Sequence, residues 1–191
     1  MKILFYTEEP IHYDGHQLAP HWLYRRFDLL GDTAVAFTGS CRVEIGEMVD
    51  IEDVKADAPI YSSLMLHIIA EFFSADLHLT VYRQRLLIVL AKEILEVQTG
   101  RQVTRRGDDL YLDRPDGTPG KLSVSIATAS VASTLIHTGF NIQTAGTPVA
   151  TVGLEELQVD IPRFAEELLR RYAAEIDDIW DARCKVRAVV E

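Results

Sequence analysis

The sequence has a shortage of positive charge and of long apolar runs, and each shortage excludes a class of partner. Lysine and arginine together number 19 against 29 aspartates and glutamates, for a net charge of -10 over 191 residues. Because no basic run interrupts this balance, we expect no duplex nucleic acid as partner. No apolar run approaches the roughly 20 residues of a membrane-spanning helix, so we expect no membrane partner either.

Cysteine is scarce as well. The only two, Cys41 and Cys184, lie far apart, and no signal peptide is recognised, so we expect free thiols and a cytoplasmic location. The sequence also lacks internal repeats and low-complexity linkers. With 48% hydrophobic and 25% charged residues, it has the composition of a globular protein. We therefore expect a single domain spanning residues 1–191.

Hydrophobic periodicity predicts a mixture of helices and short strands. The segment 77–97 has the clearest helical stripe, and Gly100 is placed to end it. The segment 62–73 is apolar on nearly all sides and predicts a deeply buried helix capped by Ser62 or Ser63. Further helices are expected at 17–29 and 163–181, and strands at 2–6, 33–37, 110–112, 121–128 and 133–137. The prediction is an α+β fold with a mainly antiparallel central sheet flanked by helices.

Two segments have weaker patterns. After the apolar strand 33–37, the small residues 39–41 precede Arg42 and predict a loop suited to close backbone approach. Residues 43–61 are acidic with scattered apolar positions. We expect one strand or irregular structure near 48–51, and the simplest interpretation of 44–57 is a solvated lid or edge.

Polar residues with chemical potential concentrate between Gly107 and Ile142. An acidic pair, Asp108 and Asp109, opens a strand, a turn rich in proline and glycine follows, and Lys121 begins an alternating strand. The alternation places Leu122, Val124 and Ile126 on one side and Lys121, Ser123 and Ser125 on the other. This layout predicts a pocket for a small molecule.

The motif Asp108-Asp109-Leu110-Tyr111-Leu112, followed by Gly120-Lys121-Leu122 and Gly139-Phe140-Asn141-Ile142, resembles the catalytic core of biotin protein ligases and lipoate ligases. The predicted helix 77–97 stands where that superfamily has a long helix. The resemblance covers roughly residues 11–142. The whole chain more closely resembles a prokaryotic family, domain-of-unknown-function family 366, which is grouped by fold with these ligases and with class II aminoacyl-tRNA synthetases.

The resemblance implies candidate roles around the pocket. Lys121 would neutralise a carboxylate and then an α-phosphate. Arg42 would assist, with Gly39 and Ser40 forming the phosphate loop. The implied cofactors are ATP and Mg²⁺. Further cofactor-binding candidates are Asp109, which would anchor a ribose, an amine or Mg²⁺, together with Ser123 and Asn141.

Each candidate has a plain structural alternative. Lys121 is also what a solvated lysine on an edge hairpin looks like, and Asp109 could simply pair with Arg105 or Arg106. The ligases carry two arginines alternating with glycines, whereas this chain offers only Arg42. Cys41 is better explained as a buried inert thiol than as a nucleophile.

Histidines near the N-terminus raise the question of a metal. His12, His16 and His21 cluster around Asp14, but no Cys-x-x-Cys or His-Glu-x-x-His pattern supports a site. Scattered surface histidines are the favoured interpretation, and we expect no metal ligand among them. His67, within an apolar run, is predicted to be a core residue.

Two functions follow from the sequence. The first is an enzyme that activates a carboxylic acid with ATP, giving an acyl-adenylate, or that transfers an acyl group. The second is a module that binds a small metabolite or nucleotide and lacks the chemistry, which the missing arginine-glycine loop favours. Either function makes a small molecule the partner, and the sequence leaves the oligomeric state open, a homodimer included.

Overall fold

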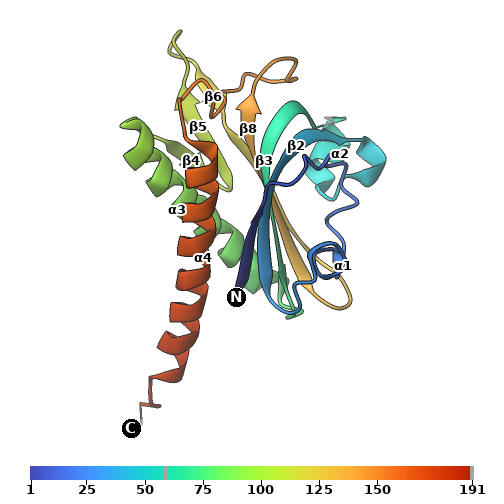
Figure 1. The fold of residues 1–191 in the computed structure, drawn as a ribbon, viewed down its shortest axis with the longest axis vertical. Helices are drawn as coiled ribbons and strands as arrows, with labels where there is room; N and C mark the ends of the chain where they lie inside the picture. Colours follow the sequence, from blue (N-terminus) through green and yellow to red (C-terminus); the bar gives the residue numbers. More distant parts are fainter. Residues whose placement is uncertain (58–59, 190–191) are drawn as a thin grey trace.

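The computed structural model describes residues 1–57 and 60–189, which form two β-sheets packed against helices (Figure 1). Within these residues, the larger sheet has five strands in the order β1-β2-β3-β8-β7, with β1 parallel to β2 and the other pairs antiparallel. The smaller sheet is antiparallel, in the order β4-β5-β6. The larger sheet comprises β1 (Lys2–Tyr6), β2 (Thr33–Val43), β3 (Ile60–Phe72), β7 (Ser123–Ala129) and β8 (Thr134–Gln143), and the smaller comprises β4 (Thr104–Arg106), β5 (Asp109–Asp113) and β6 (Pro119–Lys121).

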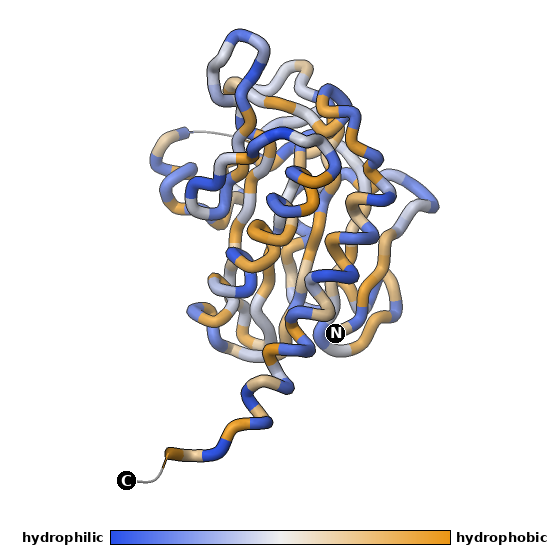
Figure 2. Tube along the Cα trace, turned by 90° about the vertical axis from the view of Figure 1, so that its left-hand side faces the viewer, coloured by the Kyte–Doolittle hydropathy of each residue, from blue (hydrophilic) through white to orange (hydrophobic). Residues whose placement is uncertain are grey.

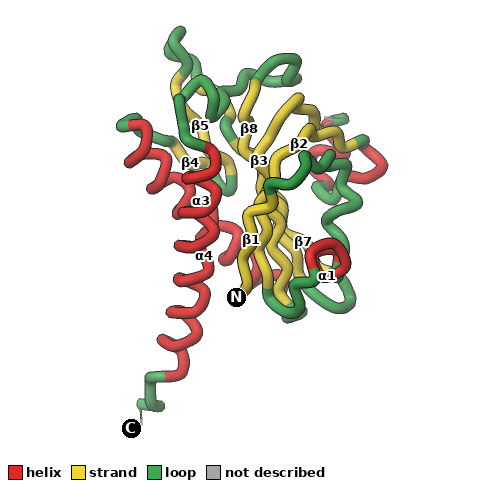
Figure 3. Tube along the Cα trace, in the orientation of Figure 1, coloured by secondary structure: helices red, strands yellow, loops and turns green. Residues whose placement is uncertain are grey.

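Helices α3 (Leu77–Thr99) and α4 (Ile161–Cys184) cover one face of the larger sheet (Figure 3). The opposite side carries α1 (Trp22–Phe27), α2 (Ile51–Ala56) and the short 3-10 helix η1 (Ile45–Glu47). The C-terminal half of α4 runs past the end of the sheet and is mostly exposed (Figures 1 and 2). Among the described residues, no helix combines the length and hydrophobicity needed to cross a bilayer.

The core lies on both faces of the larger sheet. Along β2, Ala34 and Ala36 pack on the face covered by α3 and α4, whereas Val35 and Phe37 pack on the other face. Small residues on the first face bring the helices close to the sheet, and Phe37 fills the second with Tyr13 and neighbouring apolar side chains. Both layers are fully buried, so each large side chain contributes about 1.5–3 kcal/mol of transfer free energy.

The predicted helix at 62–73 is wrong, because this segment forms β3, the central strand of the larger sheet. Leu66 and Ile68 face α3 and α4, while Met65 and Ile69 belong to the cluster on the other face. A strand covered on both faces shows no alternation of apolar and polar residues, so its composition is the same as that of a buried helix.

Other boundaries also differ from prediction. Strand β2 continues to Val43, so the expected loop at 38–42 is extended strand paired with β3. The expected helix at 17–29 is reduced to α1. Near 48–51, where one strand or irregular structure is expected, residues 48–50 are irregular and α2 begins at Ile51. Helix α3 matches its prediction, and Gly100 ends it in the left-handed region with φ 66°, its N–H donating to the carbonyl of Glu96.

Tyr172 on α4 is a buried tyrosine whose hydroxyl finds no hydrogen-bond partner among the described residues. Burial raises the pKa of this hydroxyl. Because an unsatisfied buried hydroxyl is destabilising, we expect Tyr172→Phe to raise the free energy of unfolding by about 1 kcal/mol, measured by urea denaturation. Tyr82→Phe on the exposed surface of α3 is the matched control and should change stability by less than about 0.5 kcal/mol. A loss of stability in Tyr172→Phe would contradict this prediction.

Candidate functional site

A cavity of about 570 Å³ lies where the smaller sheet meets the larger one and α2. Its volume is in the range of sites for small ligands. One wall comes from strands β5 to β8, and the wall opposite comes from the segment that contains η1 and α2. The residues that line the cavity include Tyr13, Glu47, Asp50, Glu52, Asp53, Asp57, Tyr61, Met65, Asp108, Asp109, Lys121, Val124, Ser125, Ile126, Asn141 and Val149.

Lys121 stands at the junction of the two sheets, and its backbone is fixed from three directions. It pairs with Tyr111 of β5, and its N–H donates to the carbonyl of Ala150 at 2.9 Å. Its own carbonyl accepts from Val152 N–H at 3.1 Å and from the side-chain amide of Asn141 at 3.2 Å. The position of the lysine is therefore determined by strands and not by a free turn.

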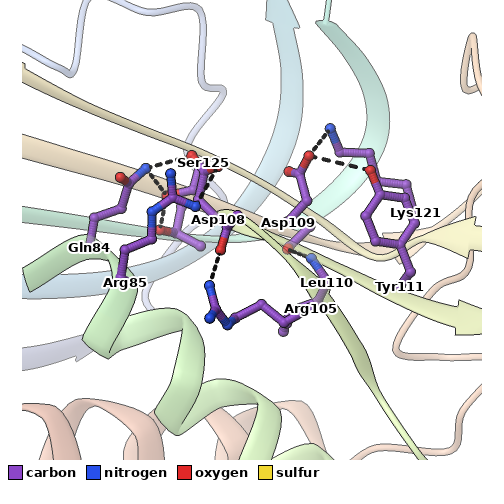
Figure 4. Close-up of polar contacts among 12 residues, drawn as sticks. Gln84, Arg85, Arg105, Asp108, Asp109, Leu110, Tyr111, Lys121 and Ser125 are labelled. Atoms are coloured by element: carbon purple, nitrogen blue, oxygen red, sulfur yellow. Dashed lines mark hydrogen bonds and ion pairs between the residues drawn. The ribbon is translucent and has the colours of Figure 1, made fainter. Parts of the chain in front are cut away.

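The Lys121 ammonium lies 2.8 Å from a carboxylate oxygen of Asp109, and both side chains are about one quarter exposed (Figure 4). The hydroxyl of Tyr111 donates to the same oxygen at 3.4 Å. Burial raises the pKa of Asp109; the adjacent ammonium pulls it back, and the charge of Asp108 adds to the rise. Burial and the charge of Asp109 raise the pKa of Tyr111.

Asp108 is held by a separate group of side chains from α3. Gln84 donates to one of its oxygens at 2.8 Å, and Arg85 donates to the other at 3.0 Å (Figure 4). The amide of Gln84 also donates to Ser125 on β7 at 3.0 Å. Adjacent carboxylates therefore have different partners, Arg85 for Asp108 and Lys121 for Asp109.

Ser123 is turned away from the cavity. The chain passes from the smaller sheet to the larger one at Leu122, whose N–H bonds the carbonyl of Leu110 and whose carbonyl accepts from Asn141 N–H. This crossing changes the phase of the alternation, so that Lys121 and Val124, three positions apart, both line the cavity. Ser123 is fully buried and its hydroxyl accepts from Leu110 N–H at 3.0 Å. The expectation that Ser123 shares a side with Lys121 is therefore wrong.

The predicted phosphate loop does not form. Gly39, Ser40 and Arg42 lie on β2 and are not among the residues that line the cavity. The guanidinium of Arg42 pairs with Glu44 at 2.7 Å, and its side chain is 68% exposed. The hydroxyl of Ser40 lies 2.8 Å from a ring nitrogen of His12.

Gly39 allows the N-terminal segment to pack closely against β2. A Cβ at this position would lie 1.8 Å from the backbone carbonyl oxygen of Ile11. The N-terminal segment runs beside β2 here, with Ile11 N–H donating to Thr38 and Tyr13 N–H donating to Ser40, both at 2.9 Å. Only glycine permits this approach of two backbones.

Several lining residues carry no signal in the sequence. Tyr13 comes from an irregular N-terminal segment and packs in a stack with His67 and His137. Tyr61 enters from the start of β3, one residue before the segment 62–73 whose helix prediction is wrong. Residues of the segment 44–57 line the cavity, and its interpretation as a solvated lid or edge stays a prediction.

His67 is buried, as predicted for a core residue. Cys41 is also buried, and burial raises the pKa of its thiol to about 12, which keeps it protonated at neutral pH. Across residues 1–57 and 60–189, no three side chains of histidine, cysteine, aspartate or glutamate gather in a geometry that could hold a metal ion.

The family model described as Domain of unknown function (DUF366) matches residues 1–187. The chain belongs to this family. The DUF366 chain is 36% identical over 186 residues to Uncharacterized protein MJ0805 of Methanocaldococcus jannaschii, an alignment covering 94% of this chain and 81% of the relative. A solved protein of unknown function from Pyrococcus horikoshi is 41% identical, with a TM-score of 0.91 and 99% of each chain covered.

More distant structures show which fold the DUF366 chain has. A biotin protein ligase from Aquifex aeolicus, in complex with biotin and ATP, superposes with a TM-score of 0.58 at 12% identity, covering 92% of this chain and 70% of the ligase. A putative lipoate protein ligase from T. acidophilum, with bound lipoic acid, gives 0.55 at 12% identity, with 92% and 86% covered. The predicted ligase-like fold of DUF366 is thereby confirmed. Sequence identities of 12% support a shared fold and nothing further.

Proposed function

We propose that this protein binds a small carboxylic acid in the cavity, with the carboxylate against Lys121. The observation that carries this proposal is the placement of Lys121, which among the described residues alone brings a basic side chain to the cavity. An ammonium has three N–H donors, and the contact with Asp109 uses one of them. The others are available to an incoming acid.

The remaining wall suits the hydrocarbon part of such a ligand. Met65, Val124, Ile126 and Val149 line the cavity with apolar surface. A pocket of mainly apolar walls with a few placed polar groups is typical of small-molecule sites. Asp109 holds the ammonium in place and is itself held by the hydroxyl of Tyr111, so little side-chain entropy is lost at Lys121 when a ligand binds.

Activation of the bound acid by ATP is the second candidate, and the fold supports it because a ligase of this fold binds biotin and ATP. The lining residues do not fit a triphosphate. A single ammonium faces an excess of carboxylates, and Arg42 points outward to Glu44. These contacts support binding over adenylation. The lining carboxylates are Glu47, Asp50, Glu52, Asp53, Asp57, Asp108 and Asp109.

We expect Lys121→Met to weaken the binding of carboxylic acids at least about tenfold, because it removes a charge-assisted hydrogen bond of about 1.5–3 kcal/mol. Isothermal titration with a panel of monocarboxylic acids measures this change. Lys92→Met is the matched control, because Lys92 also pairs with a carboxylate, is 30% exposed and lies outside the cavity. This control should bind like the wild type.

Two results would contradict the proposal. The first is that no acid binds, and the second is that Lys121→Met binds acids as tightly as Lys92→Met. A third result would favour the adenylating enzyme over the binding protein. It is acid-dependent exchange of pyrophosphate into ATP that is lost in Lys121→Met and kept in Lys92→Met.

A further inference from the structure

The cavity has an uneven distribution of charge. Glu47, Asp50, Glu52, Asp53 and Asp57 line the side formed by η1 and α2, and this set is called the acidic wall. The basic residue of that segment, Lys55, is not among the lining residues. On the opposite wall, each carboxylate has a basic partner, Arg85 for Asp108 and Lys121 for Asp109. The excess negative charge of the cavity therefore sits on the acidic wall.

From this asymmetry we infer that the ligand also carries a positive charge, an amine or a guanidinium, which faces the acidic wall. This inference rests on the proposed binding of a carboxylic acid at Lys121. The ligand is then zwitterionic, with its acid end at Lys121 and its cationic end at Asp53 and its neighbours. The acidic wall is partly exposed, so a ligand cation there would be attracted by several carboxylates without being fully removed from water.

Asp53 faces the same space as Lys121. Burial raises the pKa of Asp53, the carboxylate of Asp50 raises it further, and the charge of Lys121 lowers it. The carboxylate of Asp53 and the ammonium of Lys121 therefore interact electrostatically across the cavity. A ligand cation beside Asp53 would offset both the burial and the repulsion from Asp50.

Asn141 gives an independent indication of a ligand with N–H donors. Its side chain is only 5% exposed and lines the cavity, and its amide nitrogen donates to the carbonyl of Lys121. Within residues 1–57 and 60–189, no group donates a hydrogen bond to its amide oxygen. This oxygen opens to the cavity, where a donor from a ligand or a water molecule can satisfy it. Acceptors therefore exceed donors over the lining as a whole.

A matched series of small molecules tests the inference. The probes are ε-aminocaproate, caproate and hexylamine, which share a chain length and differ in charge, together with longer and shorter members of each class. Isothermal titration at low salt measures the dissociation constants. We expect the amino acids to bind at least about tenfold more tightly than the acids of equal length, because each has a second charged contact.

Asp53→Asn should abolish the preference for the amino acid and leave the affinity for caproate unchanged or tighter. Glu166→Gln on the exposed surface of α4 removes the same charge away from the cavity and should keep the preference. Lys121→Met should weaken the binding of caproate and of ε-aminocaproate by similar factors. The two variants thereby distinguish the contact of the acid end from the contact of the cationic end.

The outcomes distinguish this inference from the proposed function. If caproate binds as tightly as ε-aminocaproate, or if Asp53→Asn keeps the preference, the inference is overturned and the binding of acids at Lys121 stands. If no member of the series binds, both are overturned. Mg²⁺ alone raising the melting temperature, an effect lost in Asp53→Asn, with no gain from the amines, would assign the acidic wall to a metal and overturn the inference.

Discussion

Replacing Gly39 by alanine is expected to destabilise the protein by at least about 3 kcal/mol. The new Cβ would lie 1.8 Å from the carbonyl oxygen of Ile11 and 2.6 Å from its carbonyl carbon, both backbone atoms. The N-terminal segment would have to move away from β2 and lose the hydrogen bonds that Ile11 and Tyr13 make there. Urea denaturation, followed by circular dichroism, measures the change in the free energy of unfolding.

The matched control for Gly39→Ala is Gly46→Ala. Gly46 lies in η1, has open space around its Cβ position and does not have a positive φ. Its substitution should change stability by less than about 0.5 kcal/mol. Equal stability of the two variants would show that the segment around Ile11 does not pack on β2 as described.

The second large effect is a loss of stability in acid that is centred on His67. This imidazole is fully buried, and burial lowers its pKa to about 4. Its Nε2 donates to the carbonyl of Gly39 at 3.3 Å, so in the neutral ring its Nδ1 accepts from His137 Nε2 at 3.1 Å. A proton on Nδ1 would oppose that donor, so the folded state keeps the ring neutral.

The direction of the pH dependence follows from the depressed pKa. In the unfolded chain the histidine takes up a proton near pH 6.5, while in the folded protein it does so near pH 4. The contribution to stability is complete above about pH 6.5 and is lost as the pH falls toward 4. We expect His67 alone to lower the free energy of unfolding by about 2 kcal/mol between about pH 7.5 and pH 5. Urea denaturation at these two pH values measures it.

His67→Gln is the test variant and His78→Gln, at an exposed position on α3, is the control. The change in stability between the two pH values should shrink by about 2 kcal/mol in His67→Gln and stay as in the wild type in His78→Gln. Burial lowers the pKa of His137 as well, so His67→Gln should retain part of the acid sensitivity. An unchanged pH dependence in His67→Gln would contradict the assignment of a neutral ring.

The sequence predicted the elements whose environment differs between their two sides. Helix α3 is half covered, so its stripe is visible, and Gly100 has the backbone freedom that its C-terminus requires. The helix prediction failed at β3 because both of its faces are covered, which leaves no alternation to detect. Conformation there is decided by the neighbouring strands, which a local pattern does not include.

The site was predicted in the same uneven way. Asp109, Lys121 and Asn141 lie on β5, β6 and β8 and all line the cavity, as expected from a motif within one stretch of sequence. Ser123 was misplaced because the chain changes sheets at Leu122, a tertiary event without a local signal. The prediction for Arg42 fails because residues 38–42 continue β2 instead of forming a loop, and Gly39 is small to admit the Ile11 backbone.

The two walls of the cavity differ in how firmly they belong to the folded core. Lys121 and Asn141 sit on strands joined by backbone hydrogen bonds, whereas η1 and α2 contribute no buried side chain. Local stability follows buried contacts, so the wall with the lysine is preorganised and the acidic wall is the one that a ligand must order. For a ligand bound as proposed, we therefore expect η1 and α2 to govern its release, while the wall that carries Lys121 keeps its geometry whether or not the cavity is filled.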